Sequence, residues 1–313
     1  MNVKDKVAVC SRSLSANKVL RTELLSRYQH VKFNDQGLSL KGDALKEFIF
    51  DCSKVIVGLE IIDSEMLLQL PNLKVVSKYG VGIDMIDTRA FARQGIRLGW
   101  TGGVNKRSVS EIVVLFSLAL SRHLCIANSE VKTGIWNQFK GNLLTGKTVG
   151  IVGFGNIGND LSCLLQPFNC NILIYDKLDI KLPTDVPNLS KVSFEELLCQ
   201  SDIVSLHTPL NSETQNMIGV RELAAMKESA FLINTSRGGL VDESALCVAL
   251  QSGEIAGAAF DVFSQEPPEN TALLSLSNFI STPHMAGTSV ETILAMGMAA
   301  IDGLDNNKIP ENS

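Results

Sequence analysis

Short apolar runs recur along the chain, and polar or amphipathic stretches separate each run from the next. Residues 7–10, 55–57 and 73–77 have the apolar, valine-rich composition that is typical of buried β-strands. Between the first two runs, residues 14–28 place apolar side chains at helical spacing, so we expect an amphipathic helix there. This alternation predicts an α/β protein whose parallel strands are covered by helices.

The same alternation continues through the second half of the chain. A long amphipathic helix is expected from about residue 106 to 126, after the pair Gly102 and Gly103, which we interpret as a domain boundary. Five further strands are expected at 149–152, 172–175, 203–206, 230–233 and 255–260. Together they predict one doubly wound domain, in which polar residues at the carboxyl ends of the strands bind a ligand.

The strand at 149–152 runs directly into a glycine-rich turn. Gly153, Gly155 and Gly158 fit the spacing G-x-G-x-x-G, and a helical pattern begins at Asn156 and Ile157. In such a turn the first glycine permits a tight bend, the second lets the backbone approach a pyrophosphate, and the third lets helix and strand pack closely. The N–H groups at the start of the helix then face the phosphates. The segment therefore predicts a dinucleotide site.

The strand at 172–175 ends on Asp176, near the spacing of about 20 residues at which an acid accepts hydrogen bonds from the adenosine ribose. A carboxylate at this place repels a 2′-phosphate, so we expect NAD rather than NADP as the cofactor. The positive charge of the neighbouring Lys177 weakens the preference for NAD over NADP without reversing it.

The composition is that of an ordinary globular protein with about two domains in 313 residues. The formal net charge of -5 argues against a nucleic-acid surface, and the longest apolar run, 112–120, is far short of the roughly 20 residues that a membrane helix needs. Seven cysteines without a C-x-x-C pair suggest reduced thiols, and four dispersed histidines offer no metal site. Because the N-terminus does not look like a signal peptide, we expect a cytoplasmic protein that binds neither nucleic acid nor a membrane.

Residues that could contact a ligand follow several of the expected strands, at the ends where ligands of open α/β sheets bind. They are Lys78, Tyr79, Gly80, Val81 and Gly82 in the first half, and His207, Thr208, Pro209, Thr235, Ser236, Arg237 and Asp261 in the second. An ordinary strand-to-helix turn explains the segment around Gly80 equally well.

Three residues in the second half could perform chemistry. Arg237, Glu266 and His284 offer an anion-binding guanidinium, a carboxylate and a side chain that titrates near neutrality. Reduction of a 2-keto acid needs such partners, because an acid protonates the carbonyl oxygen while hydride arrives at carbon, and a cation holds the carboxylate. Each residue also has an ordinary structural explanation, as a surface ion pair, a solvated loop acid or a hydrogen-bonded core histidine.

With these residues in view, the chain resembles the D-2-hydroxyacid dehydrogenase family, and within it the phosphoglycerate dehydrogenase-like branch. The resemblance extends from about residue 55 to 287 and rests on several segments in the same order. They are KYGVGID (78–84), GKTVGIVGFGNIG (146–158), HTPL (207–210), NTSRGGLVDE (234–243), AFDVFSQEPP (259–268) and TPHMAG (282–287).

The resemblance implies a role for each matching residue. His284 would be the acid/base, Glu266 would hydrogen-bond to it and stabilise the imidazolium, and Arg237 would hold the substrate carboxylate and carbonyl. Residues 78–82 would form the substrate loop, with backbone N–H groups around Val81 and Gly82 as a carboxylate cradle. The residues implied at NAD are Gly153, Gly155, Asn156, Ile157, Gly158, Asp176, His207, Thr208, Pro209, Thr214, Thr235, Ser236, Asp261 and Gly287, and no metal is implied.

The resemblance also implies two doubly wound parallel-sheet domains. A flavodoxin-like, discontinuous substrate-binding domain would comprise residues 1–103 and 286–313, with a returning helix from about 286 to 306. Residues 104–285 would form the NAD-binding Rossmann domain. Hinge closure over NAD and a small 2-hydroxy or 2-keto acid would exclude water from the hydride path. A homodimer with its interface in residues 106–144 is a further expectation.

One segment departs from phosphoglycerate dehydrogenases, which carry an Arg-Ser-x-Thr run after the strand that corresponds to 55–57. Here residues 58–61 read GLEI, and Glu60 would repel a phosphate if it faced the cleft. Either Lys78, Lys106 or Arg107 compensates, or the substrate is another acid, such as hydroxypyruvate or glyoxylate.

Two other functions stay open on the same fold. Corepressors that resemble these enzymes sense NAD(H), but the chain shows no added interaction region. Formate dehydrogenases pair their histidine with glutamine, which Glu266 argues against. Because the chain ends at Ser313, we also expect no C-terminal regulatory domain and no control by serine through one.

Overall fold

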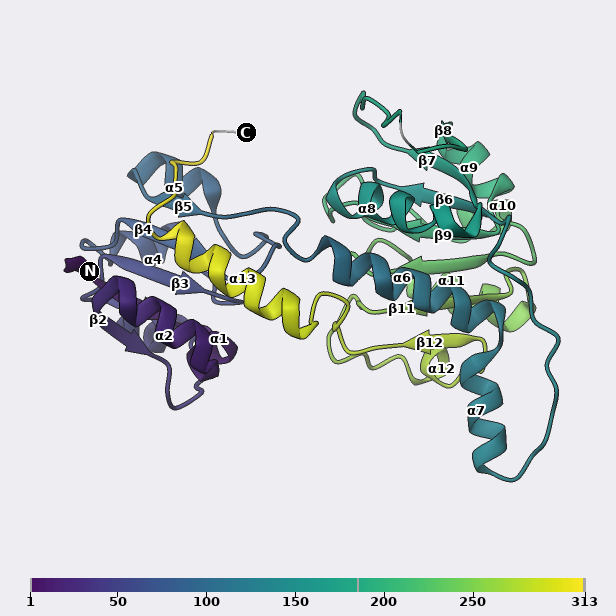
Figure 1. Ribbon diagram of the computed structural model, residues 1–313, viewed down its shortest axis with the longest axis horizontal. Helices are drawn as coiled ribbons and strands as arrows, with labels where there is room; N and C mark the ends of the chain where they lie inside the picture. The colour runs from purple at the N-terminus through teal and green to yellow at the C-terminus, as the bar shows by residue number, and fades with distance from the viewer. Residues whose placement is uncertain (1, 185, 312–313) are drawn as a thin grey trace. The chain divides into compact units, whose positions relative to one another are not determined.

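The computed structural model describes residues 2–184 and 186–311 and divides the chain into two compact units. Unit 1 comprises residues 1–105 and 288–313, and unit 2 comprises residues 106–287. Sequence analysis placed these boundaries at 103/104 and 285/286. Each unit contains one parallel sheet flanked by helices, so the predicted fold class, with two doubly wound parallel sheets, is confirmed (Figure 1).

Unit 1 is built on a five-stranded sheet with the order β2-β1-β3-β4-β5. The strands are β1 Asn2–Val9, β2 Tyr28–Phe33, β3 Lys54–Val57, β4 Val75–Lys78 and β5 Arg97–Gly99. Side chains alternate between the two faces, so Val7 and Val9 join one hydrophobic cluster and Ala8 joins the other. The apolar pattern did not predict β2, an edge strand in which only Tyr28 is buried, or β5, an edge strand of only three residues.

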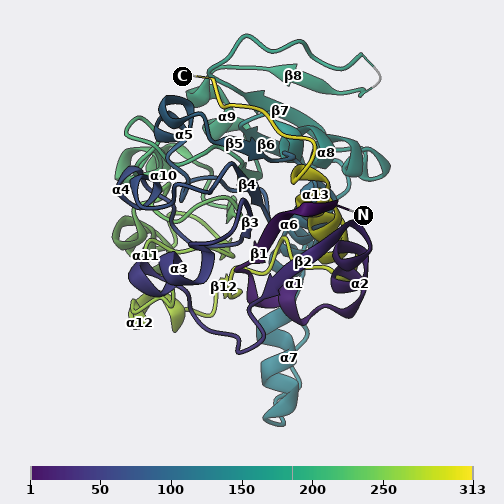
Figure 2. The same cartoon turned by 90° about the vertical axis from the view of Figure 1, so that its left-hand side faces the viewer.

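Helices cover both faces of this sheet. The helices α1 Arg12–Ala16, α2 Lys18–Arg27 and α13 Val290–Gly303 cover one face, and α3 Gly42–Ile49, α4 Ser64–Leu68 and α5 Thr88–Gln94 cover the other (Figure 2). The prediction of a single helix over residues 14–28 is wrong, because the helical conformation is interrupted at Asn17. Its extended backbone ends α1, and its side chain accepts hydrogen bonds from the N–H groups of Val19 and Leu20 to begin α2.

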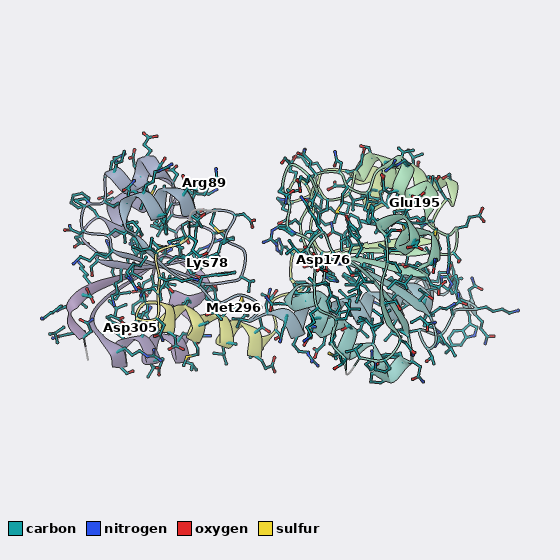
Figure 3. The ribbon with its side chains drawn as sticks, turned by 90° about the horizontal axis from the view of Figure 1, so that it is seen from above. Lys78, Arg89, Asp176, Glu195, Met296 and Asp305 are labelled. Atoms are coloured by element: carbon teal, nitrogen blue, oxygen red, sulfur yellow. The ribbon has the colours of Figure 1, made fainter. Side chains whose placement is uncertain are left out.

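The last helix, α13, completes unit 1 from the far end of the sequence. It packs so closely on the sheet that a Cβ on Gly99 would lie 2.2 Å from the carbonyl oxygen of Gly303. Beyond the helix, Asp305 accepts a hydrogen bond from Lys54 of β3 at 2.9 Å; Figure 3 labels Asp305 beside the yellow helix. Residues 288–311 therefore belong to the same packed body as β1 to β5.

Unit 2 is built on a seven-stranded sheet with the order β12-β11-β10-β9-β6-β7-β8. The strands are β6 Thr148–Val152, β7 Asn171–Tyr175, β8 Leu189–Lys191, β9 Ile203–Leu206, β10 Phe231–Asn234, β11 Gly257–Phe260 and β12 Phe279–Ser281. The strand order reverses between β6 and β9, and ligands of doubly wound sheets bind at the carboxyl ends beside such a reversal.

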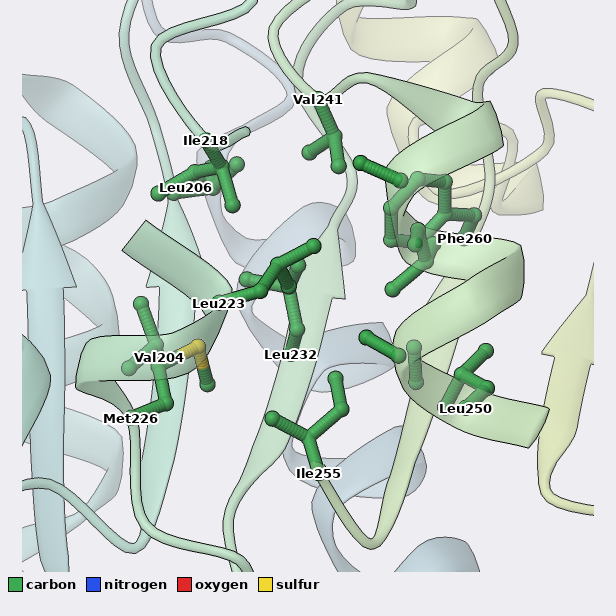
Figure 4. Close-up of a cluster of buried hydrophobic side chains, with 14 of the residues drawn as sticks. Val204, Leu206, Ile218, Leu223, Met226, Leu232, Val241, Leu250, Ile255 and Phe260 are labelled. Atoms are coloured by element: carbon green, nitrogen blue, oxygen red, sulfur yellow. The ribbon is translucent and has the colours of Figure 1, made fainter. Parts of the chain in front are cut away.

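Two hydrophobic clusters hold helices on the two faces of this sheet. One face packs against α6 Lys106–Ser121 and α8 Asn156–Leu164, which is followed by the short helix η1 Gln166–Phe168. The other face packs against α9 Phe194–Gln200, α10 Val220–Ala225, α11 Glu243–Ser252 and α12 Thr271–Leu274. Figure 4 shows this second cluster, in which Leu223 and Leu250 from the helices meet Leu232 and Phe260 from the strands.

The long helix expected over 106–126 is also interrupted. It ends at Ser121, His123 takes a left-handed conformation with φ 53, and α7 Leu124–Lys132 begins after it. None of the residues of α7 is buried, and Figure 1 shows it extending away from the sheet of unit 2. In the part of the chain that the structure describes, no single helix is long and apolar enough to span a membrane; α6 and α7 meet that test only together, across a bend of 62°.

Candidate active site

The glycine turn after β6 has the geometry that a dinucleotide requires. Gly153 has φ 93, and a Cβ there would lie 2.6 Å from the carbonyl oxygen of His207. A Cβ on Gly158 would lie 2.3 Å from the carbonyl oxygen of Gly153, so this glycine lets α8 pack against the turn. A Cβ on Gly155 would meet nothing within 4 Å, so the turn is open at this point, where α8 begins with Asn156.

Asp176 lies against the same turn. Its Oδ2 accepts a hydrogen bond from the N–H of Phe154 at 2.7 Å, and its Oδ1 accepts one from Leu178 at 2.9 Å. The neighbouring Lys177 forms an ion pair with Glu213 at 2.5 Å. This pairing balances the charge of Lys177, so Lys177 does not offset the charge of the Asp176 carboxylate.

The loops that follow β9 and β10 are joined by hydrogen bonds. The hydroxyl of Ser236 donates to the carbonyl oxygen of Thr208 at 2.8 Å. The hydroxyl of Thr214 donates to the carbonyl oxygen of Pro209 at 2.7 Å, which closes the loop after β9. The structure therefore brings four of the residues expected at the cofactor into one connected segment at the carboxyl edge of the sheet.

Two buried polar atoms at this edge have no partner among residues 2–184 and 186–311. They are Nδ1 of His207 and Oγ1 of Thr235. Burial lowers the pKa of His207 to about 3, so its imidazole is neutral, and Nε2 already shares a hydrogen bond with Ser205 at 2.9 Å. Unpaired buried atoms beside an open glycine turn fit a ligand that offers ribose and phosphate oxygens, as NAD does.

The loops of Arg237 and Glu266 are in close backbone contact. A Cβ on Gly238 would lie 1.9 Å from the carbonyl oxygen of Phe263, so only glycine fits next to Arg237. Arg237 is half-buried, and its Nη1 donates to the carbonyl oxygen of Ser236 at 2.7 Å. Glu266 is oriented by the same contact region, because its Oε1 accepts a hydrogen bond from the N–H of Phe263 at 3.1 Å.

His284 and Glu266 form a hydrogen-bonded pair. The distance from His284 Nδ1 to Glu266 Oε2 is 2.9 Å, and the side chain of His284 is 53% exposed. The carboxylate fixes the ring and leaves Nε2 as the nitrogen that can reach a substrate. His284 itself has a left-handed backbone with φ 51, which is uncommon for a residue other than glycine.

Asp261 holds the loop that carries His284. The side chain is buried, and Oδ1 accepts hydrogen bonds from Thr282 Oγ1 at 2.5 Å and from the N–H of Met285 at 2.8 Å. Oδ2 accepts one from the N–H of Ala286 at 2.8 Å, and the N–H of His284 donates to the carbonyl oxygen of Asp261 at the same distance. The resemblance placed Asp261 near the nicotinamide, but it gave no sign that both carboxylate oxygens are engaged by residues 282–286.

The predicted substrate loop lies in unit 1, after β4. Lys78 is only 5% exposed, and its Nζ donates to the carbonyl oxygens of Gly58 at 2.6 Å and Tyr79 at 2.9 Å. Lys78 therefore links the loop after β3 to the loop after β4 by hydrogen bonds. Sequence analysis missed Trp100, whose indole N–H donates to the carbonyl oxygen of Val81 at 2.9 Å and so supports the same loop.

Comparison with known proteins adds an independent result. Residues 114–286 match the family described as D-isomer specific 2-hydroxyacid dehydrogenase, NAD binding domain. The chain belongs to the D-2-hydroxyacid dehydrogenase family. This dehydrogenase is 41% identical to glyoxylate reductase of Thermofilum pendens over 253 residues, which cover 78% of this chain and 74% of that protein. It is 33% identical to hydroxypyruvate reductase of Thermotoga maritima over 287 residues, 90% of this chain and 92% of that protein.

A solved structure agrees with this assignment. The NAD complexed form of a D-isomer specific 2-hydroxyacid dehydrogenase from Lactobacillus delbrueckii ssp. bulgaricus matches with a TM-score of 0.79, at 27% identity and over 96% of each chain. The predictions of family, fold and cofactor are thereby confirmed. The protein is an NAD-dependent oxidoreductase that acts on the CH–OH group of 2-hydroxy acids.

The contacts of Asp261 generate a prediction. In Asp261→Asn, the amide nitrogen would face one of the N–H groups of residues 285 and 286, so the loop that carries His284 shifts. We expect kcat for keto-acid reduction to fall about 10- to 100-fold while the dissociation constant of NADH changes less than about threefold. Steady-state kinetics and NADH fluorescence titration measure the two values. A parallel loss of NADH affinity would instead place Asp261 at the cofactor.

Proposed function

We propose that this dehydrogenase interconverts a short D-2-hydroxy acid and its 2-keto acid, with His284 as the acid/base. The observation that carries the proposal is the hydrogen bond of 2.9 Å between His284 and Glu266. NAD supplies or accepts the hydride when it is bound. In reduction, His284 Nε2 donates a proton to the substrate oxygen, and Glu266 stabilises the imidazolium before the transfer.

Arg237 is the proposed cation for the substrate carboxylate and carbonyl. Its position next to Gly238 supports this role, because the loop is held by backbone contact and the half-buried guanidinium is restricted in its motion. The N–H groups of Val81 and Gly82 are proposed to hold the carboxylate as well. The hydrogen bond from Trp100 to Val81 supports that assignment, since it fixes the loop from behind.

The relatives suggest the class of substrate. Enzymes named glyoxylate reductase and hydroxypyruvate reductase align over most of this chain, so glyoxylate and hydroxypyruvate are proposed keto acids, with a phosphoglycerate dehydrogenase-like substrate as the alternative. Residues 58–61 lack the arginine that phosphoglycerate dehydrogenases carry there, and two of the three cations that could replace it already have other partners. Lys78 donates to backbone carbonyls, and Arg107 forms an ion pair with Asp160 at 3.0 Å.

We also propose a cytoplasmic homodimer. Supporting observations are the exposed apolar side chains of α7 and the arm that follows it, of which Trp136 is 82% exposed and Leu143 67% exposed. The free thiols of the described cysteines suit a reducing compartment.

Activity assays test the main proposal. With NADH, we expect reduction of glyoxylate or hydroxypyruvate, and at least about tenfold lower kcat/KM with NADPH, because Asp176 repels the additional phosphate. In His284→Gln, we expect kcat to fall about 10²- to 10⁴-fold, the usual contribution of a general acid. Reduction at the wild-type rate by this variant would refute the assigned role.

The pair of Glu266 and His284 generates a pH prediction. In Glu266→Gln, the imidazolium loses its carboxylate partner, so the pH optimum of keto-acid reduction should move downward. Glu269→Gln is a matched control, because Glu269 lies in the same loop but accepts its hydrogen bond from Gln265. Profiles of kcat/KM against pH for the wild type and the two variants test this prediction. An unchanged profile in Glu266→Gln would count against a role of Glu266 in stabilising the imidazolium of His284.

The molar mass of the protein in solution tests the proposed dimer. At micromolar concentration, light scattering should give twice the chain mass of 33.9 kDa. Trp136→Asp should shift the mass toward that of one chain, whereas Leu68→Asp, a similarly exposed apolar residue in unit 1, should not. A wild-type protein with the mass of a single chain would refute the dimer.

A further inference from the structure

Unit 1 contains a cavity of its own, with a volume of about 1140 Å³. Its walls come from the loops and first helical turns that follow β1, β2 and β3 and from Tyr79 after β4, all at the carboxyl edge of the parallel sheet. Tyr79 belongs both to this lining and to the substrate loop, so the cavity adjoins the loop that is proposed to hold the substrate carboxylate.

The cavity is far larger than a two- or three-carbon acid requires. Pockets of about 300 to 1,000 Å³ accommodate molecules of drug size. A substrate held at Val81 and Gly82 therefore has room to extend into the cavity with the end that lies away from the reacting carbon.

Two loops form the polar part of this cavity. A Cβ on Gly58 would lie 3.4 Å from Cβ of Ser11, so the loop after β3 lies against the loop after β1. Arg12 and Ser13 follow Ser11 directly, and Lys41 lines the cavity from the loop after β2. Arg12 and Ser13 thus line the cavity from the first turn of α1, and Lys41 lines it from the segment just before α3.

The charged groups of the lining differ in whether they already have partners. Glu60 Oε2 accepts a hydrogen bond from the N–H of Gly58 at 2.6 Å, and Asp63 Oδ1 accepts one from Met66 at 2.9 Å. Across residues 2–184 and 186–311, the side chains of Arg12 and Lys41 have no hydrogen-bond or ion-pair partner. Both acids of the cavity keep their negative charge but are held in place by hydrogen bonds from their own segments, whereas both cations have no partner among the described residues and can pair with a ligand.

We propose that this cavity binds the distal end of the substrate, that this end carries an anionic group, and that Arg12 with Lys41 recognises it. The inference rests on the proposed function and specifies its substrate class as a 2-keto acid with a second anion, a carboxylate or a phosphate. Arg12 supplies a planar fork suited to both anions, and Ser11 and Ser13, whose hydroxyl groups share a hydrogen bond at 3.2 Å, belong to the same lining.

An uncharged substrate is the competing possibility. Leu59 and Ile61 also line the cavity and are 79% and 61% exposed, so an apolar side group would gain contacts there. Such a group would leave Arg12 and Lys41 without a counter-charge. We therefore expect Leu59 and Ile61 to contact the carbon chain of the substrate, and Arg12 and Lys41 to recognise the anionic group at its distal end.

A panel of keto acids tests the proposal. Glyoxylate has no distal group, 4-methyl-2-oxopentanoate has an apolar one, 2-oxoglutarate has a carboxylate, and phosphohydroxypyruvate has a phosphate. With the full chain and NADH, kcat/KM should be highest for one of the last two, which also identifies the anion. Arg12→Gln should lower that value about 10- to 100-fold and leave glyoxylate within about twofold. Lys4→Gln is the matched control, since Lys4 is exposed at the opposite end of β1.

The outcomes separate this inference from the proposed function. Reduction of glyoxylate or 4-methyl-2-oxopentanoate in clear preference to both anionic acids would overturn the inference and leave the proposed function intact. An anion preference that survives in Arg12→Gln would overturn it as well. If no keto acid is reduced, the proposed function fails, and calorimetric titration of the NADH-bound enzyme with 2-oxoglutarate and with phosphohydroxypyruvate decides the inference. Binding of one of them that is lost in Arg12→Gln supports it, and equal binding or none overturns it.

Discussion

The candidate active site depends on one buried carboxylate. Asp261 directly follows β11, and its two carboxylate oxygens accept hydrogen bonds from Thr282, Met285 and Ala286, which fixes the course of the loop at residues 282–286. That loop holds His284 in a left-handed conformation and points its ring at Glu266. A buried carboxylate that satisfies three donors is costly to disturb, so the position of the imidazole follows from the core of the sheet rather than from the exposed loop itself.

Close backbone contacts give the rest of the site the same rigidity. Gly153 lies against His207, Gly158 against Gly153, and Gly238 against Phe263, each at a distance that excludes a Cβ. These contacts join the glycine turn to the loop after β9 and the arginine loop to the glutamate loop. Because each contact involves backbone on both sides, the polar groups they position need little reorganisation when a ligand arrives.

The contribution to substrate specificity that we propose for unit 1 rests on a different principle. Its charged residues are divided into those whose partners lie in the fold, such as Lys78 and Glu60, and those that line a cavity and have no partner among the described residues, such as Arg12 and Lys41. A charge that the fold already satisfies supports the loops, and a charge that the fold leaves unpaired is available for recognition. On this basis, the absence of a cation from residues 58–61 does not by itself argue against an anionic substrate, because the start of α1 supplies Arg12 to the same cavity.

Local sequence determined the elements with strong patterns. The strand 203–206 and the glycine turn are local features, since periodicity and backbone freedom over a few residues suffice to specify them. The local sequence did not reveal the end of α1 at Asn17, the edge strands β2 and β5, or the division between α6 and α7. At these places weak local signals compete with burial. Only the tertiary structure decided which polar groups pair: Lys78 with backbone carbonyls, Asp261 with residues 282–286, and Arg12 with no described residue. Pairing depends on distances between segments that are far apart in the chain, and those distances exist only after the sheets have assembled.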